Sequence, residues 1–232
     1  MTATYVVRVW VPDRPGALGA VASRIGSVRG DLVGIDILER GAGLAIDELV
    51  VTLPDPSLVP LLLKEIGEVD GVAVEDIREV PGGGPPDARL DALETAAILV
   101  QERTPAGVLR ALVAHAALDF AASWIAISDA DGRVVHASIG SPPPVSWIRA
   151  FVAGSRLATS TDASCTAVSG PDDMAWTALQ QAGLDLVLAR PGRPLRTRER
   201  RQLAALVAIA DVRWVELQRM SSSAVHPSVH SS

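Results

Sequence analysis

The residues from Asp13 to Leu18 offer the most specific chemistry in the chain, because their types and order suit the binding of an anion. A run of β-branched residues ends at the sequence Asp13-Arg14-Pro15-Gly16, and apolar residues at helical spacing follow it. A helix that begins here offers unpaired backbone N–H groups and about half a positive charge, which stabilise a carboxylate. Gly16 lets a ligand approach the backbone closely, and Pro15 lacks only an N–H that the first helical turn leaves unpaired.

Sequence patterns of known catalytic centres are absent. The only lysine is Lys64, outside any P-loop pattern, and the chain contains no His-Glu-x-x-His, Gly-x-Ser-x-Gly, Ser-x-x-Lys or Cys-x-x-Cys. Asp172 and Asp173 could act as paired carboxylates, but adjacent residues in a Gly-Pro loop more often cap the helix that follows, and we expect that role. Cys165 is expected to be a buried, inert thiol, with a thiol–imidazole pair to His136 as the alternative. We therefore predict no enzymatic activity and no catalytic residue.

Metal sites and cofactors are not expected either. One cysteine excludes a disulfide framework and any multi-cysteine zinc or iron–sulfur site, and it fits a reducing cytosol. His115 or His136 could hold a haem, but a single histidine is more often a hydrogen-bonded structural residue. The start of the chain lacks the features of a signal peptide, and its apolar stretches are shorter than the roughly 18–20 residues that a membrane span needs. We expect a cytoplasmic protein without a membrane partner.

The charges are distributed unevenly. Residues 1–80 contain 7 basic and 13 acidic residues, so the net charge of −6 of the 232-residue chain arises there. A negative local field favours a zwitterionic or cationic ligand over a strongly anionic one. A basic cluster near the C-terminal helix could bind nucleic acid, but no aromatic residues interleave it, so we favour a solvated turn and helix start and no nucleic-acid partner. The cluster consists of Arg190, Arg193, Arg196, Arg198, Arg200 and Arg201.

The elements that must position the turn at residues 13–18 follow the order βαββαβ up to Val80. Period-two alternation predicts the strands, and apolar residues at helical spacing predict the two helices. This order is typical of a ferredoxin-like α+β fold, in which the helices cover one side of an antiparallel sheet. The residues that carry the patterns are Tyr5 to Val11, then Leu18, Val21, Ala22 and Ile25, then Val33, Ile35 and Ile37, then Leu49, Val51 and Leu53, then Leu58 to Ile66, and finally Val72 to Val80.

Residues 3–80 resemble an ACT domain, a small regulatory module that binds amino acids. The family's Asp-x-Pro-Gly-x-Leu turn is present at residues 13–18, and the Gly-Asn-Ile-like entry into its second strand appears at residues 30–36 as Gly-Asp-Leu-Val-Gly-Ile-Asp. The resemblance implies that this turn and the start of strand two from a neighbouring subunit enclose a free amino acid. It names as ligand-binding residues Arg14, Gly16, Ala17 and Leu18 on the turn, with Asp31 and Leu32 opposite.

Asp31 departs from the commoner asparagine. An ionised aspartate only accepts hydrogen bonds, so it could hold an ammonium group but could not donate to a carboxylate. The ligand carboxylate would then depend on the helix start and on Arg14. The alternative is that Asp31 caps a turn and that residues 1–80 form a structural or dimerising module.

A Pro/Gly linker at residues 81–87 separates a second domain at residues 88–220, and a disordered tail follows at residues 221–232. Two helices, a hairpin around Asp129 to Gly132, a short helix near Trp147, a polar stretch up to Asp173, a strand at 184–189 and a long final helix are predicted for residues 88–220. The helical lead-in, the hairpin from Trp124 to Ile139 and the segment Pro194 to Leu203 resemble a GAF-like α/β sandwich, with an antiparallel sheet and flanking helices. The resemblance is at the level of the fold and carries no ligand identity. The terminal helices of such domains commonly pair in a dimer, or they pack only on their own sheet. The apolar stripe concerned is Leu90, Leu93, Leu206 and Leu217.

These observations predict a non-enzymatic regulatory protein. Its ACT domain would sense a free amino acid and relay binding through homodimerisation or through the GAF-like domain to an unidentified protein partner. One alternative is a small-molecule sensor that binds in the GAF-like cavity and uses the ACT domain as a dimerisation scaffold. Another is a pure interaction module.

Overall fold

The computed structural model describes residues 2–80, 87–131, 133–160, 171 and 173–224. The chain divides into two compact units. Unit 1 comprises Met1–Asp87 with Arg196–Arg198, and unit 2 comprises Ala88–Leu195 with Glu199–Ser232. The predicted linker, apart from Asp87, and the last eight residues of the predicted tail lie outside the described residues.

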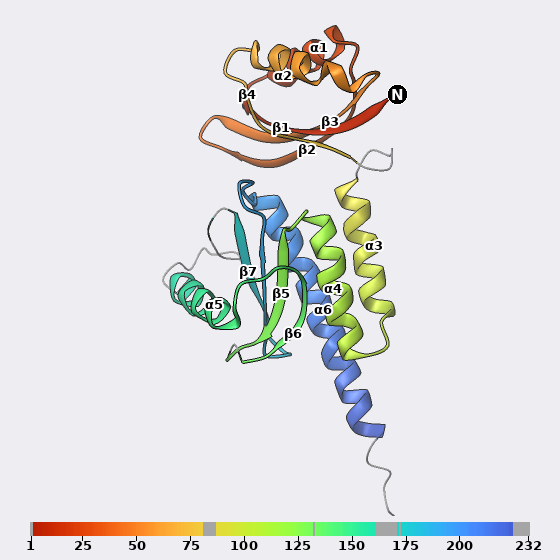
Figure 1. Ribbon diagram of the computed structural model, residues 1–232, viewed down its shortest axis with the longest axis vertical. Coiled ribbons are helices and arrows are strands. Elements are labelled where there is room, and N and C mark those ends of the chain that lie inside the picture. Colours follow the sequence, from red (N-terminus) through yellow and green to blue (C-terminus); the bar gives the residue numbers. More distant parts are fainter. Residues whose placement is uncertain (1, 81–86, 132, 161–170, 172, 225–232) are drawn as a thin grey trace, which may run out of the picture. The chain divides into compact units, whose positions relative to one another are not determined.

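Unit 1 is a four-stranded antiparallel sheet with two helices on one face (Figure 1). The strand order is β2-β3-β1-β4, which confirms the ferredoxin-like α+β arrangement. Its elements are β1 (Ala3–Pro12), α1 (Ala17–Ser27), β2 (Asp31–Gly41), β3 (Leu44–Leu53), the short 3₁₀ helix η1 (Pro56–Leu58), α2 (Val59–Gly67) and β4 (Ala73–Glu79).

The core of unit 1 lies between the sheet and the helices because alternate strand residues point to that face. Val7 and Val9 of β1 meet Leu49 and Val51 of β3 there, and all four side chains are fully buried. The helices contribute residues at helical spacing, and each buried aliphatic side chain stabilises the fold by about 1.5–3 kcal/mol. These helix residues are Val21, Ile25, Leu62 and Ile66.

Unit 2 is a second antiparallel sheet, of order β6-β5-β8-β7, with helices on both faces. Helices α3, α4 and α6 cover one face and α5 covers the other (Figure 1). Its elements are α3 (Ala88–Gln101), α4 (Pro105–Asp119), β5 (Trp124–Asp129), β6 (Val135–Gly140), α5 (Val145–Ser160), β7 (Met174–Leu179), β8 (Leu184–Ala189) and α6 (Thr197–Ala224).

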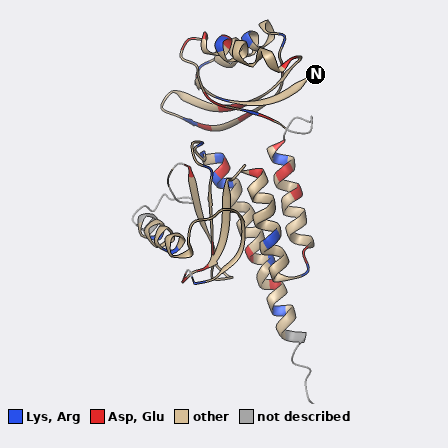
Figure 2. Ribbon diagram, viewed as in Figure 1, with Lys and Arg blue, Asp and Glu red and all other residues tan. Residues whose placement is uncertain are grey.

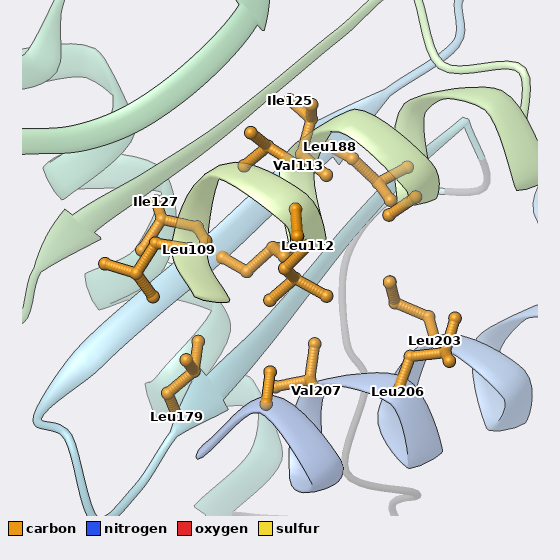
Figure 3. Close-up of a cluster of buried hydrophobic side chains, with 14 of the residues drawn as sticks. Leu109, Leu112, Val113, Ile125, Ile127, Leu179, Leu188, Leu203, Leu206 and Val207 are labelled. Carbon is orange, nitrogen blue, oxygen red and sulfur yellow. The ribbon is translucent and has the colours of Figure 1, made fainter. Parts of the chain in front are cut away.

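Two apolar clusters hold unit 2 together, one on each face of its sheet. Figure 3 shows the larger one, in which α4, the strands and α6 meet through Leu112, Ile125, Leu188 and Val207. The smaller cluster packs Ile148 and Val152 of α5 against the other face. This packing divides the apolar stripe considered for a dimer into two pairs of residues. Leu206 and Leu217 are buried in their own core, whereas Leu90 and Leu93 are exposed.

Two predicted helix ends in unit 2 were wrong and one strand was not predicted. Helix α5 runs to Ser160, beyond the short helix predicted near Trp147, and strand β7 begins directly after the predicted polar stretch, which ended at Asp173. Asp173 therefore precedes a strand instead of capping a helix; Asp172 lies outside the described residues. Helix α6 continues to Ala224, four residues into the predicted tail, because no proline or glycine interrupts it there.

Candidate functional site

The start of α1 presents backbone donors that the fold leaves unused. Gly16 precedes the helix with φ of 85°, in the left-handed region, and no side chain caps this helix start. Ala17 N–H donates to the carbonyl oxygen of Arg14 (3.3 Å), and Ala20 N–H donates to that of Gly16 (3.0 Å). Within the described part of the chain, the N–H groups of Leu18 and Gly19 have no such backbone acceptor. They are available to an anionic group.

The surroundings of this helix start are open. A Cβ atom placed on Gly16 would meet no other atom within 4 Å. Residues 13–16 are all exposed. The space around Gly16 is therefore open, and glycine is required at position 16 by its backbone conformation and not by crowding.

The predicted turn residues differ in what they can offer. Arg14 is 60% exposed and lies 3.8 Å from the fully exposed Asp70, a loose ion pair that leaves its guanidinium accessible. Ala17 is buried and Leu18 packs against the core. These two residues can therefore contact a ligand mainly through their backbone.

The structure does not bring Asp31 and Leu32 to this turn within one chain. Asp31 pairs with Thr52, whose β1 partner is Thr4, whereas the turn follows Pro12 at the opposite end of β1. Strand β2 has 11 residues, and at about 3.3 Å per residue it separates Asp31 from Gly41, beside the turn, by roughly 30 Å. One chain thus holds the two parts of the predicted site at opposite ends of its sheet.

Strand β2 forms an edge of the sheet and carries exposed apolar side chains. Val33, Ile35 and Ile37 are 43%, 43% and 38% exposed. Ile35 and Ile37 pair with Leu49 and Asp47 and so belong to the helix-covered face. The pairing with β3 is interrupted by two irregularities, near Val33 and near Leu38. An apolar edge of this kind is suited to pairing with another chain.

Asp47 of β3 is a residue of this region that sequence reasoning missed. It pairs with Val9 of β1 and Ile37 of β2, so its side chain lies on the helix-covered face, and it is only 3% exposed. Burial raises the pKa of the Asp47 carboxyl, Arg40 opposes that rise and Asp13 adds to it. Its Oδ1 atom has no hydrogen-bond partner within the described residues.

A signal for Asp47 was present in the sequence. It occupies the same phase of the alternation as Leu49, Val51 and Leu53, the inward-facing phase of β3. A charged residue in that phase marks a buried charge. Figure 2 shows that charged positions also lie along the strands of unit 1 and not only in its turns.

The arginine cluster between Arg190 and Arg201 does not form one solvated surface, which corrects the prediction. Arg190 is 3% exposed, and its guanidinium donates to the carbonyl oxygens of Phe120 (3.0 Å) and Pro194 (2.7 Å) and to Glu199 Oε2 (2.6 Å). Arg200 donates to the carbonyl oxygens of Leu195 and Pro171. These guanidiniums donate hydrogen bonds to loop carbonyl oxygens, and that of Arg190 also pairs with a carboxylate. At least Arg190 is therefore a structural residue.

The remaining candidates do not assemble a metal or catalytic centre among the residues that the structure describes. His136 is exposed on β6 and His115 is half-buried in α4, while Cys165 lies outside the described residues. No group of three or more His, Cys, Asp or Glu side chains in the described ranges could hold a metal ion. None of the helices described combines the length and the apolar character that a bilayer crossing requires.

Comparison with known proteins gives matches only among solved structures. A scan against protein-family models finds no match, and a search of the curated proteins finds none either. The ACT domain of GTP pyrophosphokinase from Chlorobium tepidum is similar over 34% of this chain and 100% of its own length, at 14% identity and a TM-score of 0.28.

Two further structures match at the same level. An uncharacterised protein from Thermotoga maritima is 21% identical over 36% of this chain and 100% of its own, with a TM-score of 0.27. A formyltetrahydrofolate deformylase from Pseudomonas putida is 16% identical over 39% of this chain and 36% of its own, with a TM-score of 0.28. The structural neighbours thus include an ACT domain, at low identity and over part of the chain.

Proposed function

We propose that this chain is a non-enzymatic regulatory protein of the cytoplasm that binds a free amino acid at the start of α1. The observation that carries the proposal is the uncapped, exposed helix start at Gly16, with the donors of Leu18 and Gly19 unused. A carboxylate is the natural ligand for such donors. The acidic surroundings favour a ligand that also carries a positive charge, and an amino acid zwitterion meets both conditions.

The second part of the proposal is a homodimer through β2. Two edge strands that pair antiparallel about a two-fold axis near Asp36 would bring Asp31 of the partner subunit close to Gly41, and hence to the turn that follows Pro12. The same pairing would cover Ile35 and Ile37. This arrangement reunites the residues that one chain keeps apart, and it agrees with the site that the ACT resemblance implies.

In this dimer the ligand would act as a switch of assembly. A ligand that contacts both subunits stabilises the paired state over the separated one, because it binds that state better. The bound state would then pass to a protein partner through the dimer or through the GAF-like second domain.

Calorimetric titration of the full chain with each of the 20 standard amino acids tests the proposal. We expect heat of binding with at least one of them for the natural chain and its loss in Gly16→Leu, whose side chain obstructs the approach to the helix start. Gly183→Leu is the matched control, because Gly183 also has positive φ (68°) and open space around it but lies in unit 2. The proposal fails if no amino acid binds, or if both variants bind as the natural chain does.

A further inference from the structure

Asp47 places a carboxyl oxygen in the core of unit 1 without a hydrogen-bond partner among the described residues. The side chain is 97% buried, and Oδ1 receives no hydrogen bond from any described residue. A buried polar atom without a partner costs free energy, and for an ionised carboxylate that cost is larger. Arg40 is near enough to influence the carboxyl group but is itself exposed on β2. Oδ1 of Asp47 therefore lacks a hydrogen-bond donor among the described residues.

The position of Asp47 relates it to the start of α1. Asp47 lies three residues from Leu44 at the end of β3, a distance of about 10 Å along the strand. That end is tied to the turn at residues 13–16, because Asp13 N–H donates to the carbonyl oxygen of Gly43 over 2.9 Å. The unused acceptor of Asp47 and the unused donors of α1 thus lie toward the same end of the sheet, on the face that the helices cover.

Two side chains of the edge strand lie near Asp47. Ile37 pairs with Asp47 on β2 and is 38% exposed, and Arg40 is exposed beside the β2–β3 turn. Rotamer changes of such side chains are fast. A shift of these two side chains would open a route to the carboxylate from this edge.

We propose that Oδ1 of Asp47 accepts a hydrogen bond from the primary ammonium group of the ligand whose carboxylate lies at the start of α1. This inference rests on the proposed function and adds to it the group that selects the ligand. The site would then require an α-ammonium group and would reject 2-hydroxy acids and N-acetylated amino acids. Asp47 supplies this contact from the same chain as the helix start, independently of Asp31 of the partner subunit.

The test uses the full chain and two variants, Asp47→Asn and Glu39→Gln. Each removes one carboxylate, but Glu39 pairs with Ile46 and belongs to the opposite face of the sheet. The probes are the amino acid that binds most tightly, its 2-hydroxy analogue and methylammonium. We expect Asp47→Asn to weaken amino-acid binding by about tenfold or more, Glu39→Gln to leave it within a factor of about two, and the hydroxy analogue to bind poorly to all forms.

The outcomes separate this inference from the proposed function. The role of Asp47 is overturned, and the proposed function is left standing, if Asp47→Asn binds the amino acid as tightly as the natural chain does. The same follows if the natural chain binds the hydroxy analogue as tightly as the amino acid. Methylammonium binding that depends on Asp47, without any amino-acid binding, supports the ammonium contact and overturns the proposed function. Binding of neither probe overturns both. Thermal unfolding shows that each variant is folded, and we expect Asp47→Asn to be the more stable protein.

Discussion

The backbone N–H of Asp13 donates a 2.9 Å hydrogen bond to the carbonyl oxygen of Gly43. This bond joins the turn before α1 to the turn between β2 and β3, so the helix start and the end of the edge strand are held as one piece. The β2–β3 turn is built on left-handed backbone, with φ of 51° at Ala42 and 78° at Gly43. Its geometry therefore affects the candidate site directly.

Replacement of Gly43 by alanine should destabilise the protein by about 1–2 kcal/mol, because a Cβ atom disfavours positive φ. Gly41→Ala is the control within the same turn; its φ is not positive and its Cβ would meet no atom within 4 Å. Urea unfolding of the two variants measures the difference. Equal stabilities would contradict the importance of the left-handed conformation at Gly43.

Ile35→Glu should weaken the proposed dimer by about tenfold or more, because it places a charge in an apolar edge that pairing would cover. Leu61→Glu is the control, since Leu61 has the same 43% exposure but lies on α2. Analytical ultracentrifugation over a range of protein concentrations gives the dissociation constants. A dimer that Ile35→Glu leaves intact would exclude pairing through β2.

Arg190→Gln should destabilise the protein by about 3 kcal/mol or more, because it removes a largely buried ion pair with Glu199 and the hydrogen bonds to several loop carbonyls. Arg149→Gln removes an exposed arginine of α5 and should change the stability by less than about 0.5 kcal/mol. Chemical denaturation compares the two. A small effect at Arg190 would contradict its structural role and favour the predicted solvated surface.

The stability gained in Asp47→Asn should depend on pH. The pKa of Asp47 is raised in the folded protein above its ordinary value of 3.8, mainly by burial. The folded state therefore holds the proton more tightly than the unfolded chain, and the contribution of this group to stability falls as the pH rises from the ordinary pKa through the raised one. Asparagine does not ionise, so the variant avoids this loss.

Unfolding free energies measured between pH 3 and pH 7 test this sign. The difference between Asp47→Asn and the natural chain should be smallest at the acidic end and should grow to a constant gain at neutral pH. Glu39→Gln serves as the reference for other effects of losing one carboxylate. A difference that is largest in acid would mean that the Asp47 carboxylate is stabilised by the fold rather than strained by it.

The fold of unit 1 was predictable because its signals are local. Val7, Val9 and Val11 alternate on one face of a strand, and Val21 and Ile25 repeat at helical spacing, so the order of elements follows from the sequence alone. Strand β7 was missed because Met174 to Leu179 is short and the Gly-Pro turn before it was interpreted as the start of a helix. Leu206 and Leu217 have the pattern of an apolar stripe, but only packing decides that this stripe faces its own sheet.

The candidate site was only partly predictable for a similar reason. Arg14 to Leu18 are contiguous, so a motif finds them together. The distance of Asp31 from the helix start depends on strand register, and Asp47 lies beside Ile37 only because β2 and β3 pair. A linear sequence pattern contains neither relationship.

The separation of Asp31 from the turn along β2 has a consequence for what such a protein reports. In the proposed dimer the contacts from the turn and those from Asp31 and Leu32 come from different chains, and pairing completes two sites at once. Occupancy then depends on the abundance of the protein as well as on the concentration of the amino acid, and the two dependences are linked. The response would therefore require both enough protein and enough amino acid. A change in expression level would shift the amino-acid concentration at which the protein responds, without altering any contact.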